Sequence, residues 1–275
     1  MPTTASNFAA LCLVLFFLPA QMNTDYVDGF GLHSAEIADI NSRDAAKVIW
    51  QDDEVESIPE SLTHYMGREI AQTMHFSGSS WLIRESREQE ERCSMLLANM
   101  GLRTEMTVCD MGCGNGYYAL PIAEIIGHRG QVIAVDVQIE MLERLQQRMA
   151  EKNITNITPI LGAYHDPFLE PETIDLLLMV DVYHEFSHPE PMLSAIRRAL
   201  KPNGIICLVE YRAEDPKVPI KELHKMSKDQ INKEYLANGF RLVREFDRLS
   251  WQHVMFFEKD GRSEEEISES LAESR

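Results

Sequence analysis

Three glycines separated by single residues stand between an apolar run and a stretch with helical spacing. The apolar run ends in Asp110, and the glycines that follow it are Gly112, Gly114 and Gly116. Because glycine has no Cβ atom, such a loop can turn sharply and let a ligand lie against its backbone. Residues 108–123 therefore predict a strand, a cofactor-binding loop and a helix.

A second carboxylate follows at the distance that a nucleoside-binding sheet needs. Residues 131–136 read Gln-Val-Ile-Ala-Val-Asp, so that this apolar run ends in Asp136. In such sheets an acid at this strand end accepts hydrogen bonds from the two ribose hydroxyls, to which a carboxylate offers two oxygens. Asp136 thus predicts a nucleoside cofactor.

Two more polar residues follow a third apolar run, at residues 174–180, and these are Asp181 and His184. A histidine can accept a proton from an oxygen or nitrogen nucleophile near neutral pH. It can equally be a hydrogen-bonded part of a pocket wall. For Asp181 the alternative to a role in the site is capping of the helical segment that follows it. We predict that this segment is the catalytic edge of the site.

Strand-like and helix-like segments alternate around these residues. Strands are expected at residues 131–136, 157–161, 174–180 and 205–209, and helices around residues 141–149 and 190–200, the latter ending before Pro202-Asn203-Gly204. This alternation favours a mostly parallel sheet with helices on both faces and ligands at the carboxyl ends of its strands.

The last two strand-like runs, 240–246 and 252–257, are joined by only five residues. That link is too short for a parallel crossover, so these strands must be antiparallel. We therefore expect a doubly wound, Rossmann-like α/β fold, with a mostly parallel seven-stranded sheet and a C-terminal antiparallel hairpin strand.

The chain outside this fold divides into three segments. Residues 1–20 contain an apolar run closed by Pro19-Ala20 that resembles a signal peptide or anchor. Export or membrane association is expected if this run acts as a signal or is retained, and a cytoplasmic location otherwise. Residues 21–94 predict a linker and an N-terminal lid, residues 95–260 the main domain, and residues 261–275 an acidic, disordered tail.

Composition limits the possible partners. The chain of 275 residues has 26 Lys and Arg against 44 Asp and Glu, a net charge of -18, which is the wrong sign for binding nucleic acid. Its five cysteines form no C-x-x-C pair, so we predict neither a metal site nor a disulfide framework. A small-molecule substrate is the expected partner.

Taken together, these motifs resemble those of the class I S-adenosylmethionine-dependent methyltransferases. The resemblance covers roughly residues 95–258 and includes the acidic strand ends, the spaced glycines and the segment 199–204, Ala-Leu-Lys-Pro-Asn-Gly. It implies S-adenosyl-L-methionine as the cofactor, direct methyl transfer as the reaction, and a sheet that ends in an antiparallel pair. The methyl acceptor is not identified.

The resemblance also implies roles for single residues. The three glycines would pass under the methionine part of the cofactor, Asp110 would reach its ammonium group, and Asp136 would bind the ribose. Asp181 would border the methyl group, and His184 would be catalytic. The adenine contact is open, because Gly162-Ala163-Tyr164-His165-Asp166 displaces the family's usual acid. Either the amide of Ala163 or the side chain of Asp166 could serve.

Three alternatives can be compared with this interpretation. A nicotinamide-dependent oxidoreductase would need glycine at position 117, where the chain has Tyr117. A non-catalytic module that only binds S-adenosylmethionine is compatible with the loop. A methyltransferase with clustered thiols is disfavoured, because Cys109 and Cys113 lie in the strand and the glycine loop themselves. Trp81, Arg84 and Arg87 are candidates for the lid, and Tyr211 for the acceptor pocket.

Overall fold

The computed structural model describes residues 58–273. The predicted signal or anchor at residues 1–20, and the predicted linker as far as residue 57, lie outside the described residues. Among residues 58–273, no helix is both long and apolar enough to span a bilayer.

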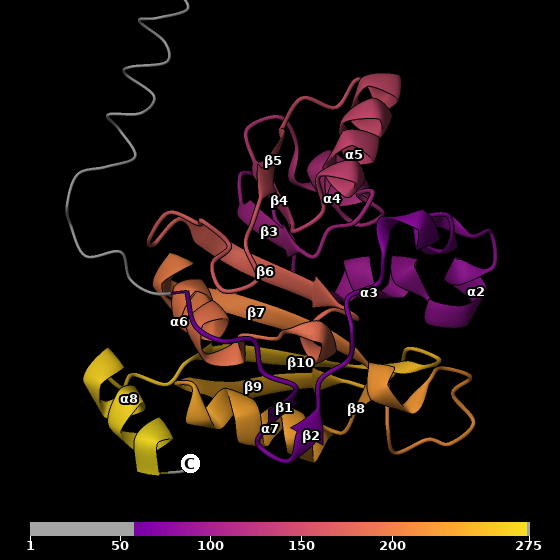
Figure 1. Cartoon of the computed structure of the whole chain (residues 1–275). Coiled ribbons are helices and arrows are strands. Elements are labelled where there is room, and N and C mark those ends of the chain that lie inside the picture. Colours follow the sequence, from indigo (N-terminus) through magenta and orange to yellow (C-terminus); the bar gives the residue numbers. More distant parts are fainter. Residues whose placement is uncertain (1–57, 274–275) are drawn as a thin grey trace, which may run out of the picture. The chain divides into compact units, whose positions relative to one another are not determined.

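A single large sheet organises the described chain (Figure 1). Its strands are β3 (Thr107–Met111), β4 (Gln131–Asp136), β5 (Ile157–Leu161), β6 (Ile174–Val180), β7 (Leu200–Arg212), β9 (Phe240–Phe246) and β10 (Gln252–Lys259). They lie in the order β5-β4-β3-β6-β7-β10-β9, and the first five are parallel. β10 runs antiparallel to both of its neighbours. The structure thus confirms the doubly wound fold and the antiparallel end, and adds the two-residue strand β8 (Lys225–Met226) beside β7.

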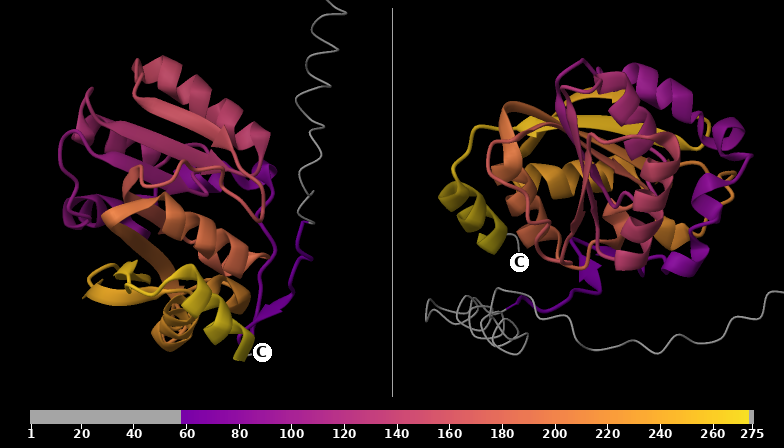
Figure 2. Two further views of the ribbon diagram at one scale, coloured as in Figure 1. Left: turned by 90° about the vertical axis from the view of Figure 1, so that its left-hand side faces the viewer. Right: turned by 90° about the horizontal axis from the view of Figure 1, so that it is seen from above.

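Helices cover both faces of the sheet (Figure 2). One face carries α3 (Cys93–Asn99), α4 (Ala119–Ile126) and α5 (Ile139–Lys152), and the other carries α6 (Pro189–Ala199) and α7 (Lys228–Ala237). Because side chains alternate along a strand, each buried strand supplies both layers. On β6, for example, Leu176 and Leu178 join the α4 side, whereas Leu177 and Met179 join the α6 side.

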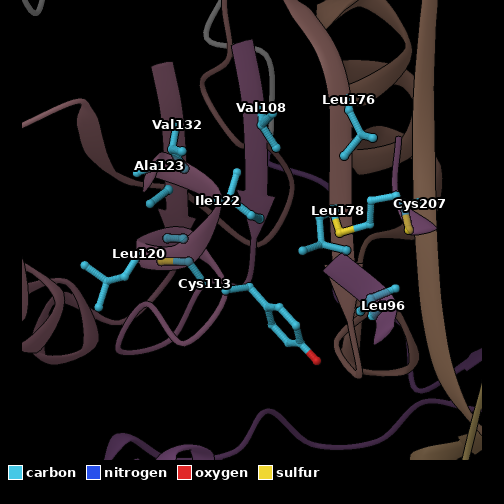
Figure 3. Close-up of a cluster of buried hydrophobic side chains, with 14 of the residues drawn as sticks. Leu96, Val108, Cys113, Leu120, Ile122, Ala123, Val132, Leu176, Leu178 and Cys207 are labelled. Carbon is cyan, nitrogen blue, oxygen red and sulfur yellow. The ribbon is translucent and has the colours of Figure 1, made fainter. Parts of the chain in front are cut away.

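Figure 3 shows part of the first layer, where Val108, Val132 and Leu176 on adjacent strands lie near Leu120 and Ile122 of α4. These side chains are at most 3% exposed. A sheet buried on both faces leaves only its strand ends for ligands. The fold therefore directs attention to the loops at the carboxyl ends of β3, β4, β6 and β7.

Two predicted boundaries differ from the structure. The charged residues from Glu85 and the apolar stripe at residues 95–100 together predict one helix, but the chain forms α2 (Arg87–Glu91) and α3, separated by Arg92 with φ +54°. The break lets α2 bury Glu91 beside the predicted site while α3 buries Leu96 in the core. The strand predicted at residues 205–209 is also longer in the structure. It is β7, which starts at Leu200 and includes Pro202-Asn203-Gly204, and its pairing with β6 has a register shift.

The prediction of a disordered C-terminal tail is wrong for residues 264–273, which form α8 (Glu264–Glu273). Its sequence is acidic, but Ile267 and Leu271 are one turn apart and both are buried. Ser263 and Glu266 form a capping box, in which the Glu266 amide donates to Ser263 Oγ and the Ser263 amide donates to Glu266 Oε2. Burial of Ile267 and Leu271 and the N-terminal capping box therefore stabilise a helix here despite the acidic sequence.

Candidate cofactor and acceptor pocket

A cavity of about 480 Å³ opens at the carboxyl ends of the parallel strands. The loops after β3, β4 and β5 and the start of α5 contribute Gly112, Gly114, Asp136, Gln138, Met141, Ala163 and Tyr164 to its lining. The segments after β6 and β7 contribute Asp181, His184, Glu185, Tyr211, Lys221 and His224. The topology thus joins the predicted cofactor residues and the predicted catalytic edge in one cavity.

Two of the three glycines shape this cavity. Gly112 and Gly114 line it and have φ values of +69° and +53°, which L side chains rarely adopt. A Cβ atom would lie 2.4 Å from Val182 Cγ2 at Gly112, and 2.6 Å from Leu82 Cδ1 at Gly114. Glycine is required at both positions by the backbone conformation and by close neighbours, as the cofactor-loop prediction expects.

Gly116 packs against α5. It is absent from the residues that line the cavity, and a Cβ atom there would lie 2.3 Å from Leu145 Cδ1 of α5. The glycine therefore lets the loop pack closely on this helix. Contact between Gly116 and the cofactor stays a prediction.

Asp110 lies behind the glycine loop, near the end of β3. It is 3% exposed, and its Oδ2 has no hydrogen-bond partner among residues 58–273. Burial raises the pKa of this carboxyl to about 7. A buried carboxylate oxygen without a partner suits the ammonium group of S-adenosylmethionine. Since Asp110 is not a lining residue, that contact would run through the loop or through water.

Asp136 lies at the cavity wall with both oxygens oriented by the backbone. Oδ1 accepts a hydrogen bond from the Gln138 amide and Oδ2 accepts one from the Gly114 amide, each at 2.9 Å. Burial raises the pKa of this carboxyl. Each carboxylate oxygen can accept a second bond, so the pair of ribose hydroxyls remains a suitable ligand. The same bonds tie the glycine loop to β4.

The predicted adenine contacts are not supported. Ala163 lines the cavity, but its amide donates to the Asp166 carbonyl at 2.8 Å and is therefore already used. The Asp166 side chain accepts from the Phe168 amide at 2.7 Å, and Asp166 does not line the cavity. The turn after β5 closes on itself, which could not be read from the order of residues.

Asp181 is half-buried, with a strained backbone and a buried carboxylate oxygen, and does not act as a helix cap. Its φ is +52°, its Oδ2 accepts from Gln252 Nε2 at 2.7 Å, and its Oδ1 has no partner among the described residues. Burial, with Glu91 and Glu210 nearby, raises its pKa well above the usual value. The helix that follows, η3 (Tyr183–Glu185), has Val182 as its N-cap without a side-chain bond. The capping alternative is therefore excluded.

His184 is the centre of a polar cluster. Its ring Nδ1 lies 2.6 Å from Glu210 Oε2, and its Nε2 lies 3.0 Å from His224 Nδ1. The His184 amide also donates to Glu210 Oε1. Burial lowers the pKa of His184, but the Glu210 carboxylate more than reverses that effect and the net shift is upward. His184 is thus a hydrogen-bonded part of the cavity wall, and its role as a proton acceptor stays a prediction.

Sequence reasoning missed Glu210 and gave no individual role to Glu185 or His224. Glu210 continues the apolar run of β7, so the same signal that identified Asp136, an acid at the end of a buried strand, could have found it. Glu185 is adjacent to His184, and burial raises the pKa of its carboxyl to about 7. His224 lies in η4 (Glu222–His224) and has no periodic pattern around it. Only the fold brings it to His184.

The segment predicted as a lid contributes directly to the cavity. Trp81 and Arg87 line it, and the Arg84 guanidinium stacks 3.6 Å from the Trp81 ring centroid. Glu91, which is 0% exposed, accepts from Arg84, from Arg87 at 2.8 Å and from the Tyr211 hydroxyl at 2.9 Å. One buried carboxylate thus joins α2, β7 and the end of η2 (Trp81–Ile83), whose C-cap is Arg84. Burial raises the pKa of Tyr211, whose hydroxyl is already a donor in this network.

The cysteines do not form a cluster in the part of the chain that the structure describes. Cys93, Cys109, Cys113 and Cys207 are all buried and free. Burial raises the pKa of the thiols of Cys109 and Cys113.

Comparison with known proteins gives the class. Residues 102–266 match a family model described as a methyltransferase domain. A solved S-adenosylmethionine-dependent methyltransferase from Aquifex aeolicus superposes with a TM-score of 0.64 at 23% identity, over 67% of this chain and 98% of the other. The chain therefore belongs to the class I S-adenosylmethionine-dependent methyltransferase family, as its motifs suggested, and shares the cofactor of that class.

Two curated relatives match shorter parts of the chain than the solved structure does. An uncharacterised methyltransferase-like protein of Schizosaccharomyces pombe is 36% identical over 112 residues, which is 41% of this chain and 40% of that protein. The ubiquinone/menaquinone biosynthesis C-methyltransferase UbiE of a Shewanella strain is 24% identical over 167 residues, 56% of this chain and 66% of that protein. The match thus spans less than two thirds of either relative.

Proposed function

We propose that the protein transfers a methyl group from S-adenosyl-L-methionine directly to a small-molecule acceptor. One observation carries the proposal: Gly112, Gly114 and Asp136 share a cavity with Asp181 and His184. Its volume of about 480 Å³ is that of a typical small-molecule site. A module that only bound the cofactor would need no polar cluster beyond it.

The lining supports a mechanism based on alignment and the exclusion of water. When bound, S-adenosylmethionine supplies an electrophilic methyl group. The chain supplies the rest: Asp136 and Asp110 fix the cofactor, while Trp81, Phe186 and Met192 give the cavity apolar walls. Positioning of two reactants and desolvation are the main contributions that a direct displacement needs from the protein.

His184 keeps its predicted role as proton acceptor in this proposal, in a restricted form. Its Nδ1 is occupied by Glu210, so Nε2 is the ring nitrogen left to take a proton, and this atom faces His224. An acceptor hydroxyl or amine that uses His184 must therefore enter beside both imidazoles. Unchanged turnover of His184→Ala with bound cofactor would remove this role.

Calorimetric titration with S-adenosylmethionine, with its demethylated product and with NAD tests the cofactor. We expect the first two to bind and Asp136→Asn to weaken them at least tenfold. Asp229→Asn is the matched control, since Asp229 is exposed on α7 and does not line the cavity, and it should leave affinity unchanged. Binding of NAD alone would overturn the proposal.

Methyl transfer from labelled cofactor into a metabolite mixture then tests the reaction. Label should appear in a small-molecule fraction with wild-type protein. Tight binding without any transfer would instead favour the non-catalytic module. The relative UbiE is named a C-methyltransferase of ubiquinone and menaquinone biosynthesis, so quinol-like compounds belong in the mixture.

A further inference from the structure

Three groups that commonly bind metals converge on the β6–β7 side of the cavity. They are the imidazoles of His184 and His224 and the carboxylate of Glu185, and one donor atom from each lies within 4.8 Å of the others. His184 Nε2 is 3.0 Å from His224 Nδ1 and 3.9 Å from Glu185 Oε1. All three residues line the cavity, so a cation there would be accessible to a ligand.

The backbone holds this cluster from several directions. His184 and Glu185 belong to η3, directly after β6, and the His184 carbonyl accepts from the Ala71 amide and from Arg68. The Met74 amide donates to Glu185 Oε1 at 3.2 Å. The segment before the domain thus fixes η3 while η4 presents His224. The groups are preorganised rather than gathered on a flexible surface.

Glu210 gives the cluster the outer partner that metal-binding histidines normally have. Its carboxylate, 0% exposed, accepts the Nδ1 hydrogen of His184 at 2.6 Å, which leaves the Nε2 lone pair directed toward His224. A carboxylate behind a ligating histidine fixes the tautomer and the orientation of the ring. With metal bonds of about 2.1 Å, two nitrogens at the right angle of an octahedral site lie about 3 Å apart, and at the tetrahedral angle usual for zinc they lie about 3.4 Å apart. The 3.0 Å between His184 Nε2 and His224 Nδ1 matches the octahedral separation, and the 3.9 Å to Glu185 Oε1 corresponds to a wider angle at the metal.

We propose that His184, Glu185 and His224 bind one divalent transition-metal cation. Two imidazoles and one carboxylate suit zinc or ferrous iron, and three protein ligands leave coordination positions open toward the cavity. The ligand class for those positions is an oxygen donor, such as a hydroxyl of the acceptor, whose pKa a bound cation lowers. The proposal of a cation site does not depend on methyl transfer. The proposal that an acceptor hydroxyl binds the cation does depend on the proposed function.

Such a cation would change the chemistry assigned to His184. With Nε2 coordinated, the imidazole holds the cation, and the cation takes over the acidification of the acceptor. Without it, His184 and His224 would share a hydrogen bond.

Titration of the metal-stripped, untagged full chain with Zn²⁺ and with Co²⁺ tests the site. We expect one equivalent to bind, with a Co²⁺ visible spectrum of a nitrogen and oxygen ligand set. His224→Ala and Glu185→Gln should each weaken binding at least 100-fold. Glu210→Gln should weaken it about 10- to 100-fold while keeping the stoichiometry, because it changes only the outer partner.

His128→Ala is the matched control, since His128 is exposed in the turn after α4 and should bind metal as wild type does. Titration of each variant with S-adenosylmethionine shows that its cofactor site is still folded. Failure of wild type to bind one equivalent, or equal binding by the His224→Ala variant, would overturn the site. If wild type bound the metal but did not bind S-adenosylmethionine, the proposed function would fail and the metal site would stand.

Discussion

Asp110 carries a buried carboxyl group whose charged form the fold disfavours. Burial raises the pKa of its carboxyl from the usual 3.8 to about 7. The fold therefore favours the protonated form, and its contribution to stability is full below about pH 4 and is lost as pH rises toward 7. Each unit of such a shift corresponds to about 1.4 kcal/mol, so the cost in the cofactor-free protein can reach a few kcal/mol.

Asp110→Asn should accordingly melt at a higher temperature than wild type at pH 8. The advantage should shrink as pH falls from 7 toward 5, because wild type then regains its proton. The same variant should bind S-adenosylmethionine at least tenfold more weakly. Thermal melts across this pH range, with and without cofactor, measure both effects. A melting difference that does not change with pH would contradict the assignment.

The residues at the site differ in how far the sequence could predict them. Asp110, Asp136 and Asp181 each end a buried strand, and a local pattern was enough to find them. His224 depends on the path of the chain after β7, and the closure of the Ala163 turn depends on a backbone bond. Neither feature produces a periodic pattern in the sequence. The packing of Gly116 against Leu145 was also not predictable, because a glycine needed by a ligand and one needed by a helix look alike in the sequence.

At the scale of elements, the glycine loop must also fit against α5. Gly116 has φ +80° and would place a Cβ 2.3 Å from Leu145, whereas Gly101 has φ +78° and nothing within 4 Å. Gly116→Ala should therefore destabilise the protein by about 2–4 kcal/mol, from backbone strain and overpacking together. Gly101→Ala carries the strain alone and should cost about 1 kcal/mol. Urea unfolding of both variants separates the two effects, and equal losses would contradict the packing role.

The lid segment is joined to the sheet through Glu91. Side chains of α2 and β7 meet at this buried carboxylate, and the side chain of its partner Arg87 is only 5% exposed. Glu91→Gln should cost about 3–5 kcal/mol, because it leaves a buried guanidinium without its counter-charge. Glu105→Gln breaks the exposed pair with Arg129 and should cost at most about 1 kcal/mol. Similar losses in the two variants would show that the lid network is not a stabilising connection.

The strand and helix order of the whole molecule was predictable, because alternating apolar runs and one short link leave few topologies open. Its ends were not. The tail was assigned to disorder from its acidic composition and its lack of aromatic residues, although Ser263 and Glu266 already carried a capping signal. What decided the outcome was the surface beside Gly239, to which Ile267 is close enough to exclude a Cβ. Such a surface exists only after the domain has folded.

If α8 is part of the folded unit, shortening its buried side chain must destabilise the whole domain. Ile267 is 8% exposed, so Ile267→Ala should lower the free energy of unfolding by about 2–3 kcal/mol. Ile125→Ala makes the same change on α4, where the side chain is 44% exposed, and should cost well under 1 kcal/mol. Urea unfolding compares them directly. A tail that is not docked would make Ile267→Ala the milder change, because a side chain in water in both states contributes nothing to folding.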